Sequence, residues 1–170
     1  EVKRPQEPKE PFPYLSEEVK FENKIDSVML AGTLTMPDNG SNFPAVVMIT
    51  GSGGEDRNEE IFGHKPFLVI ADFLTKNGIA VLRFDDRGIG ESTGNQSTGT
   101  SEDFVRDVLA GVDYLKSRKE INHSKIGLIG HSEGGMIAPM AAVKSQDVNF
   151  IILMAGTGIA GDSILILQSE

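Results

Sequence analysis

Residues 126–140 read IGLIGHSEGGMIAPM, and this stretch decides the fold. It begins as a short apolar run typical of a buried strand and continues in a pattern typical of a helix. Between the two lies GHSEG, residues 130–134. A Gly-x-Ser-x-Gly pattern is weak when it stands alone, because Gly and Ser are common. Placed between a strand and a helix, it predicts a sharp turn that lifts the hydroxyl of Ser132 above the sheet.

The two glycines around Ser132 support this prediction. A Cβ at Gly130 or Gly134 would collide where the strand and the helix pass closely, and glycine removes that clash. The backbone N–H of Glu133, at the start of the helix, is then expected to point toward negative charge that develops on a substrate oxygen. The alternative interpretation is an ordinary glycine-rich turn in which Ser132 only caps the helix.

Two parts of the chain are distinguished by composition. Residues 1–14 hold four prolines among charged residues, a composition that favours extended chain and cannot build a core. We therefore expect a proline-rich linker over residues 1–16 and one domain over residues 17–170. In that domain, residues 17–23 and 28–37 alternate polar and apolar side chains around NKIDS, which predicts an antiparallel β-hairpin with one solvated face.

The rest of the domain alternates strand and helix patterns. Four short apolar runs are typical of parallel strands buried on both faces: residues 45–50, 79–84, 125–130 and 150–156. Residues 65–78 and 100–118 have helical spacing, with Pro66 near the start of the first and Thr100 or Ser101 as the cap of the second. The order predicts a doubly wound α/β fold, with a mostly parallel sheet and its functional site at the carboxyl ends of the strands.

Composition excludes several classes of function. A formal net charge of −9 argues against nucleic acid as a partner, since binding phosphates requires clustered Lys and Arg. The chain has no Cys, which excludes disulfides, thiolate metal sites and a Cys nucleophile. No apolar run approaches the length of about 20 residues that a membrane-spanning helix needs. We expect neither a metal nor a cofactor.

The loop after the 45–50 strand reads TGSGGEDRN, residues 50–58. It occupies the place from which a second oxyanion donor is expected, and the backbone N–H of Ser52 is our candidate. Gly51 and Gly53 are expected to border the substrate. A dinucleotide-binding loop is the rival interpretation, but Asp56 stands where the third Gly of that fingerprint belongs, and neighbouring acidic residues would repel a pyrophosphate.

A second polar stretch, RFDDRGIGES at residues 83–92, follows the next strand. We expect a structural role for it, as a turn held by ion pairs and hydrogen bonds beside the site. Asp85 and Asp86 resemble a glycosidase pair in composition only, because adjacent residues at a strand end point to opposite faces.

The order of TGSGG, LRFDDRGIGES and KIGLIGHSEGG resembles that of the α/β-hydrolase superfamily, in particular bacterial serine esterases and hydrolases similar to the serine aminopeptidase group. The resemblance covers about residues 17–168. It implies that Ser132 is the nucleophile, and that the acid and the His follow it along the chain. The opening residues RPQEPKEPFPY also resemble the linker that follows an extra amino-terminal domain in some larger relatives. Such proteins are often exported from bacteria, so a periplasmic or secreted location is expected. Relatives cleave carboxylic esters, thioesters or peptides.

The histidines do not fit that order, because His64, His123 and His131 all precede Ser132. We expect His123 in a surface turn, and His131 either packed away from the hydroxyl or bordering the substrate. His64 opens a helix after the oxyanion loop, and both a substrate-pocket role and a packing role stay open. Asp162 is not assigned as the acid. The chain is therefore expected to be the amino-terminal portion of a hydrolase whose acid and base lie beyond Glu170.

These observations predict a serine hydrolase that cleaves carboxylic esters through an acyl-enzyme on Ser132, incomplete within this chain. The alternatives are a thioesterase or peptidase of the same fold, or a non-catalytic binding module that retains the turn. The expected partner is a small ester or acyl substrate. Because the sheet is expected to stop after its sixth strand, FIILM at residues 150–154 would lie at an open edge and favour self-association.

Overall fold

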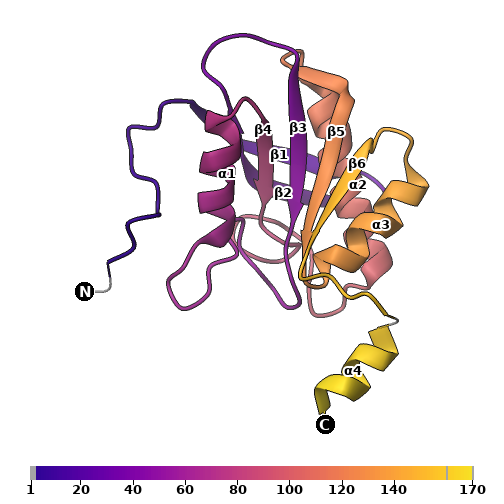
Figure 1. Cartoon of the computed structure of the whole chain (residues 1–170). Coiled ribbons are helices and arrows are strands. Elements are labelled where there is room, and N and C mark those ends of the chain that lie inside the picture. Colours follow the sequence, from indigo (N-terminus) through magenta and orange to yellow (C-terminus); the bar gives the residue numbers. More distant parts are fainter. Residues whose placement is uncertain (1–2, 160, 170) are drawn as a thin grey trace.

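The computed structural model describes residues 3–159 and 161–169. Figure 1 shows a twisted sheet with helices on both faces. The elements follow one another in the predicted order of a hairpin and then alternating strands and helices: β1 (Leu15–Asn23), β2 (Val28–Met36), β3 (Phe43–Ile49), α1 (Pro66–Lys76), β4 (Ala80–Phe84), α2 (Ser101–Ser117), β5 (Ile121–His131), α3 (Gly134–Lys144), β6 (Phe150–Met154) and α4 (Gly161–Ser169).

The sheet has the strand order β1-β2-β4-β3-β5-β6. β2 pairs antiparallel with both β1 and β4, whereas β4, β3, β5 and β6 are parallel neighbours. The chain leaves β3 toward β4 on one side and later returns to β5 on the other side. Ligands of open α/β sheets bind at such a switch point, beyond the carboxyl ends of the strands. The predicted doubly wound, mostly parallel fold is confirmed.

Each face of the sheet has its own apolar cluster. In β3, Val46 and Met48 belong to the smaller cluster, which contains Phe67 and Ala71 of α1. The alternate residues of β3 belong to the larger cluster beneath α2 and α3. Successive side chains of a strand point to opposite faces, so a strand covered by helices on both sides is apolar throughout. This burial explains why the central strands read as continuous apolar runs.

The boundaries of the helices follow local signals. α1 begins at Pro66, whose missing N–H costs nothing in the first turn. α2 begins after Thr100, where a capping box forms: the Asp103 carboxylate accepts the Thr100 N–H at 2.7 Å, and the Thr100 hydroxyl accepts the Asp103 N–H at 3.4 Å. Thr100, one of the two predicted caps, is therefore the cap in the structure.

The β6 edge of the sheet carries large apolar side chains. Phe150, Ile152 and Leu153 are each 40% exposed or more. Among the described residues, β6 has β5 as its only sheet neighbour. Exposed apolar edges recruit partners, so self-association through this edge stays a prediction.

The amino-terminal segment forms turns but no helix or strand over residues 3–14. Tyr14 at its end is buried, and its hydroxyl donates a hydrogen bond to Asp72 of α1 at 3.0 Å. β1 then begins at Leu15. The division into a linker over residues 1–16 and a domain over residues 17–170 stays a prediction. None of the helices in the described parts of the chain is both long and apolar enough to cross a bilayer.

Candidate active site

Ser132 lies in the predicted turn between β5 and α3, with a φ of +51°. A positive φ is uncommon for a residue with a side chain and marks local strain. Backbone hydrogen bonds hold the turn: the Ser132 N–H donates to the Met154 carbonyl of β6 at 3.0 Å, and the Gly135 N–H donates to the Ser132 carbonyl at 2.9 Å. The strained strand-to-helix turn predicted from the sequence is confirmed.

The glycines on either side of Ser132 allow the strand and the helix to approach closely. A Cβ at Gly130 would collide with the carbonyl of Gly134. A Cβ at Gly134 would collide with the carbonyl of Ile49 at the end of β3. Both positions therefore require glycine. At Gly130 the reason is the one inferred from the sequence, whereas at Gly134 the obstacle is the end of β3, which lies directly beside the turn.

The loop after β3 reaches the same turn. A Cβ built on Gly51 would lie 3.4 Å from the Cβ of Ser132, so Gly51 and Ser132 are in near contact. Among the described residues, neither the Ser52 N–H nor the Glu133 N–H donates a hydrogen bond to another backbone group. Two unpaired amides thus flank Ser132, one in the loop and one at the start of α3, where the helix dipole adds partial positive charge.

A buried carboxylate, Glu59, joins the loop to the turn. Its Oε1 accepts the Gly51 N–H at 2.9 Å and lies 2.7 Å from Nδ1 of His131. The His131 ring is therefore held by Glu59, rather than packed without a polar partner. Sequence reasoning missed Glu59, because the residues of this pair are 72 positions apart and no local pattern connects them.

Asp85 and Asp86 hold the same loop at two other points. The Asp85 carboxylate accepts the Arg57 N–H at 2.9 Å and forms an ion pair with the Arg57 guanidinium at 2.7 Å. The Asp86 carboxylate accepts the Thr50 hydroxyl at 2.8 Å and the Glu55 N–H at 2.9 Å. The two neighbouring carboxylates thus bind different partners, and the structural role predicted for residues 83–92 is confirmed.

The environments of these two carboxyls shift their pKa values in opposite directions. Burial raises the pKa of Asp86 to about 7, and the hydrogen bonds from Glu55 and Thr50 only partly offset this. Burial also disfavours the ionised form of Asp85, but hydrogen bonds from Arg57 outweigh it and hold the Asp85 pKa below its usual value. Asp85 is therefore a stable anion at neutral pH, whereas Asp86 titrates there.

The raised pKa of Asp86 predicts a pH-dependent stability. The unfolded carboxyl ionises near 3.8 and the folded one near 7, so between these values the unfolded state loses its proton first. Stability due to Asp86 is therefore present below about pH 4 and is lost as the pH rises toward about 7. We expect the unfolding free energy of the wild type, minus that of Asp86→Asn, to fall across this range in urea titrations. A constant difference would contradict the shift.

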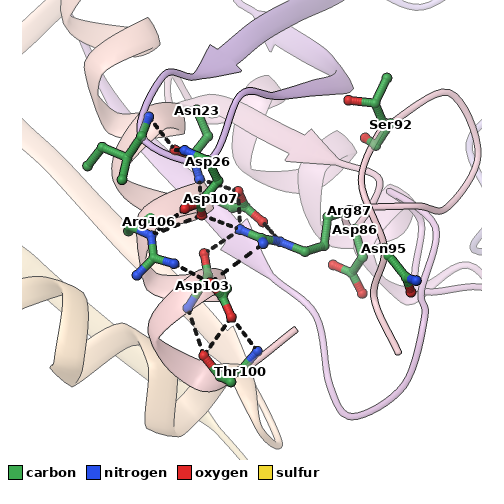
Figure 2. A network of polar contacts seen from close by, with 12 residues as sticks. Asn23, Asp26, Asp86, Arg87, Ser92, Asn95, Thr100, Asp103, Arg106 and Asp107 are labelled. Atoms are coloured by element: carbon green, nitrogen blue, oxygen red, sulfur yellow. Dashed lines mark hydrogen bonds and ion pairs between the residues drawn. The ribbon is translucent and has the colours of Figure 1, made fainter. Parts of the chain in front are cut away.

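Arg87, which follows Asp86 in the chain, binds a different set of partners and forms the centre of an ionic network (Figure 2). Its Nε donates to Asp107 of α2 at 2.7 Å, and its Nη2 donates to Asp26, beside the β1–β2 turn, at 2.9 Å. The Asn23 amide also donates to Asp107, at 2.7 Å. The network links the hairpin, the turn after β4 and helix α2, so it fixes the side of the site that faces α2.

A cavity of about 30 Å³ lies beneath the loop, between α2 and α3. Its apolar side includes Phe104 and Ile137, and its polar side includes Asp86 and Glu133. This volume accommodates about two or three water-sized groups. Gly51 and Gly53, both expected to border the substrate, line the cavity, whereas His64 and His131 do not.

The other histidines lie outside this cavity. His64 is exposed and closes a tight turn with Ile61, in which each N–H donates to the other's carbonyl, at 3.0 and 2.9 Å. His123 is exposed within β5, which begins at Ile121, so its expected placement in a turn before the strand is wrong. Polar side chains obscured this start in the sequence, but Ile121 pairs with Phe43 of β3.

No side chain in the described parts of the chain forms a hydrogen bond with the Ser132 hydroxyl. The same residues include no group of three or more His, Asp or Glu side chains arranged to hold a metal ion. Asp162 lies in the first turn of α4 and is exposed. The site thus combines a strained Ser and two unpaired amides, a chemistry suited to attack on a carbonyl group and to stabilisation of the resulting oxyanion.

The strand order and the strained Ser at the end of β5 define an α/β-hydrolase. The family described as "Serine aminopeptidase, S33" matches residues 65–163. The chain belongs to this family.

Three known proteins illustrate the similarity. Esterase EstD from Thermotoga maritima is 37% identical over 74% of this chain and 30% of its own length. Thiohydrolase aneE from Aspergillus aculeatus is 34% identical over 75% of this chain and 38% of its own length. The solved structure of the Pyrococcus furiosus esterase Pf2001 superposes with a TM-score of 0.66 at 29% identity, over 79% of this chain and 48% of that one. The chain thus spans about a third of the length of these two curated relatives.

Proposed function

We propose that this protein is a serine hydrolase that cleaves carboxylic esters through an acyl-enzyme on Ser132. The observation that carries the proposal is the strained Ser132 flanked by the unpaired amides of Ser52 and Glu133. This combination supports nucleophilic attack on a carbonyl carbon, because the two N–H groups would bind the oxygen that becomes negative. Esterase and thiohydrolase relatives support hydrolase activity.

In the proposed reaction, Ser132 Oγ forms a bond to the carbonyl carbon and its proton passes to a base. The Ser52 and Glu133 amides hold the oxyanion. The intermediate collapses, the bond to the alcohol oxygen breaks, and the alcohol leaves with a proton. Water then attacks the acyl-enzyme, releasing the carboxylic acid and restoring the Ser hydroxyl.

The base is proposed to come from residues that follow Glu170 in a longer form of the protein, together with the acid that orients it. Of the described histidines, His131 is bound to Glu59, while His64 and His123 are exposed and do not line the cavity. The order of catalytic residues that is typical of this superfamily supports a position of both groups after the nucleophile. Thioester cleavage is the second candidate, favoured by the thiohydrolase relative.

A fluorophosphonate probe tests the proposal, since it reacts quickly only with an activated Ser. We expect rapid labelling of the longer protein, no labelling of Ser132→Ala, and unchanged labelling of Ser124→Ala, which removes an exposed hydroxyl from β5. Equal labelling of wild type and Ser132→Ala would contradict the proposal. Slow labelling of all three folded proteins would favour a non-catalytic module that retains the turn.

A further inference from the structure

We propose that Glu59 is a positioning residue for the oxyanion hole, holding the loop so that the Ser52 N–H faces the substrate oxygen. This inference rests on the proposed function and assigns a role to a residue that does not itself touch the substrate. It starts from one carboxylate oxygen, Oε1, which contacts both sides of the site.

The two contacts of Glu59 fall on equivalent positions. Gly51, whose N–H donates to Oε1 at 2.9 Å, immediately precedes Ser52. His131, whose Nδ1 lies 2.7 Å from the same oxygen, immediately precedes Ser132. Glu59 therefore ties the residue before the loop amide to the residue before the nucleophile. The spacing between the attacking oxygen and the oxyanion donor depends on this connection.

The contact between Glu59 and Gly51 matters because Gly51 is flexible. Glycine has no side chain to restrict its backbone, so the direction of the following peptide N–H depends on outside partners. The Gly51 N–H is fixed by Glu59, while the Ser52 N–H stays unpaired among the described backbone groups. Without the carboxylate, the peptide between Thr50 and Gly51 would lose this partner, and the Gly51–Ser52 peptide that follows it would have additional orientations.

Glu59 is built into the fold at some cost. The residue is 6% exposed and has a φ of +52°. Such a backbone is unfavourable for a residue with a side chain, and a buried carboxylate is unfavourable unless it is paired. Strain of this kind persists where the surrounding structure determines it: the Glu59 N–H donates to the Asp56 carbonyl at 2.8 Å.

A purely structural role does not explain Glu59, because the loop has other anchors. Asp86 binds Thr50 and Glu55, and Asp85 binds Arg57. These contacts hold the loop on both sides of Ser52. The two carboxylates belong to the residues that directly follow β4. Glu59 adds a connection from this loop to His131, the last residue of β5 and the neighbour of Ser132. Removing it should therefore disturb the oxyanion hole more than the fold.

The test compares Glu59→Ala and Glu59→Gln in the full-length protein, with Glu60→Ala as the control. Glu60 is the exposed neighbour, so its variant removes the same charge without touching the site. Binding of the oxyanion strengthens in the transition state, so we expect Glu59→Ala to lower kcat about 10- to 100-fold with KM nearly unchanged. Gln retains an oxygen that can accept from Gly51 and His131, and should restore kcat to within about threefold of wild type.

Two results would overturn the inference. One is a wild-type kcat in folded Glu59→Ala while Ser132→Ala is inactive, which would leave the proposed function intact. The other is a loss of kcat in Glu59→Ala that is equally large in Glu59→Gln and that is proportional to the loss of folded protein in thermal melts. If Glu59→Ala does not fold, Glu59→Asp replaces it, because the shorter side chain withdraws the carboxylate and should still lower kcat. Turnover that survives in Ser132→Ala would instead refute the proposed function itself.

Discussion

Replacing Ser132 with Ala is expected to lower the turnover of a short-chain nitrophenyl ester by about 10⁴- to 10⁶-fold in the longer protein. The substitution removes the attacking oxygen and leaves the Ser52 and Glu133 amides in place. The residual rate would come from binding and from the oxyanion donors alone. The backbone strain at Ser132, with its φ of +51°, is expected to persist, so the variant should fold. Initial rates on purified protein measure the effect.

Turnover by the 170-residue chain alone tests whether the base lies outside this chain. Because no described side chain forms a hydrogen bond with the Ser132 hydroxyl, we expect no measurable ester turnover from this chain alone. Rapid turnover by the short chain that is lost in both Ser132→Ala and His64→Ala would identify His64 as the base and contradict the proposal. Activity confined to the longer protein, and retained there in His64→Ala, would support a base beyond Glu170.

Replacing Arg87 with Ala is expected to destabilise the fold by about 3–5 kcal/mol. The Arg87 side chain is 7% exposed and that of Asp107 is 4% exposed. Removal of the guanidinium leaves the Asp107 carboxylate buried, with the Asn23 amide as its remaining hydrogen-bond partner among the described residues. It also removes one of the two arginines that bind Asp26. Breaking a buried ion pair on one side is costly because the other charge stays desolvated. Urea unfolding measures the change.

Lys20 provides the control for this second prediction. It forms an ion pair with Glu91 at 3.1 Å, in which both side chains are more than half exposed. Exposed pairs contribute little, since water screens the charges, so Lys20→Ala should unfold at nearly the wild-type urea concentration. Similar midpoints for Arg87→Ala and Lys20→Ala would show that the network in Figure 2 does not stabilise the fold as its burial implies.

Much of the fold was predictable because its signals are local. Alternating side chains at residues 17–23 and 28–37 predicted the hairpin that became β1 and β2, and apolar runs predicted the parallel strands. The turn at Ser132 was predictable as well, because the clash that requires Gly130 arises within five residues, with the carbonyl of Gly134. The start of β5 was missed, because Ile121 is followed by polar residues 122–125 before the apolar run, and its place in the strand comes from pairing with Phe43 of β3.

The sequence by itself determined the order of the elements and the strained turn at Ser132 with Gly130 before it, because periodicity and steric exclusion act between near neighbours. Only the tertiary structure decided which distant side chains meet: Glu59 with His131, and Arg87 with Asp107. Charged residues are common in loops, and a carboxylate pairs equally well with many cations or amides. Its partner depends on where the sheet brings the strand ends together, and that arrangement is set by the packing of the whole domain.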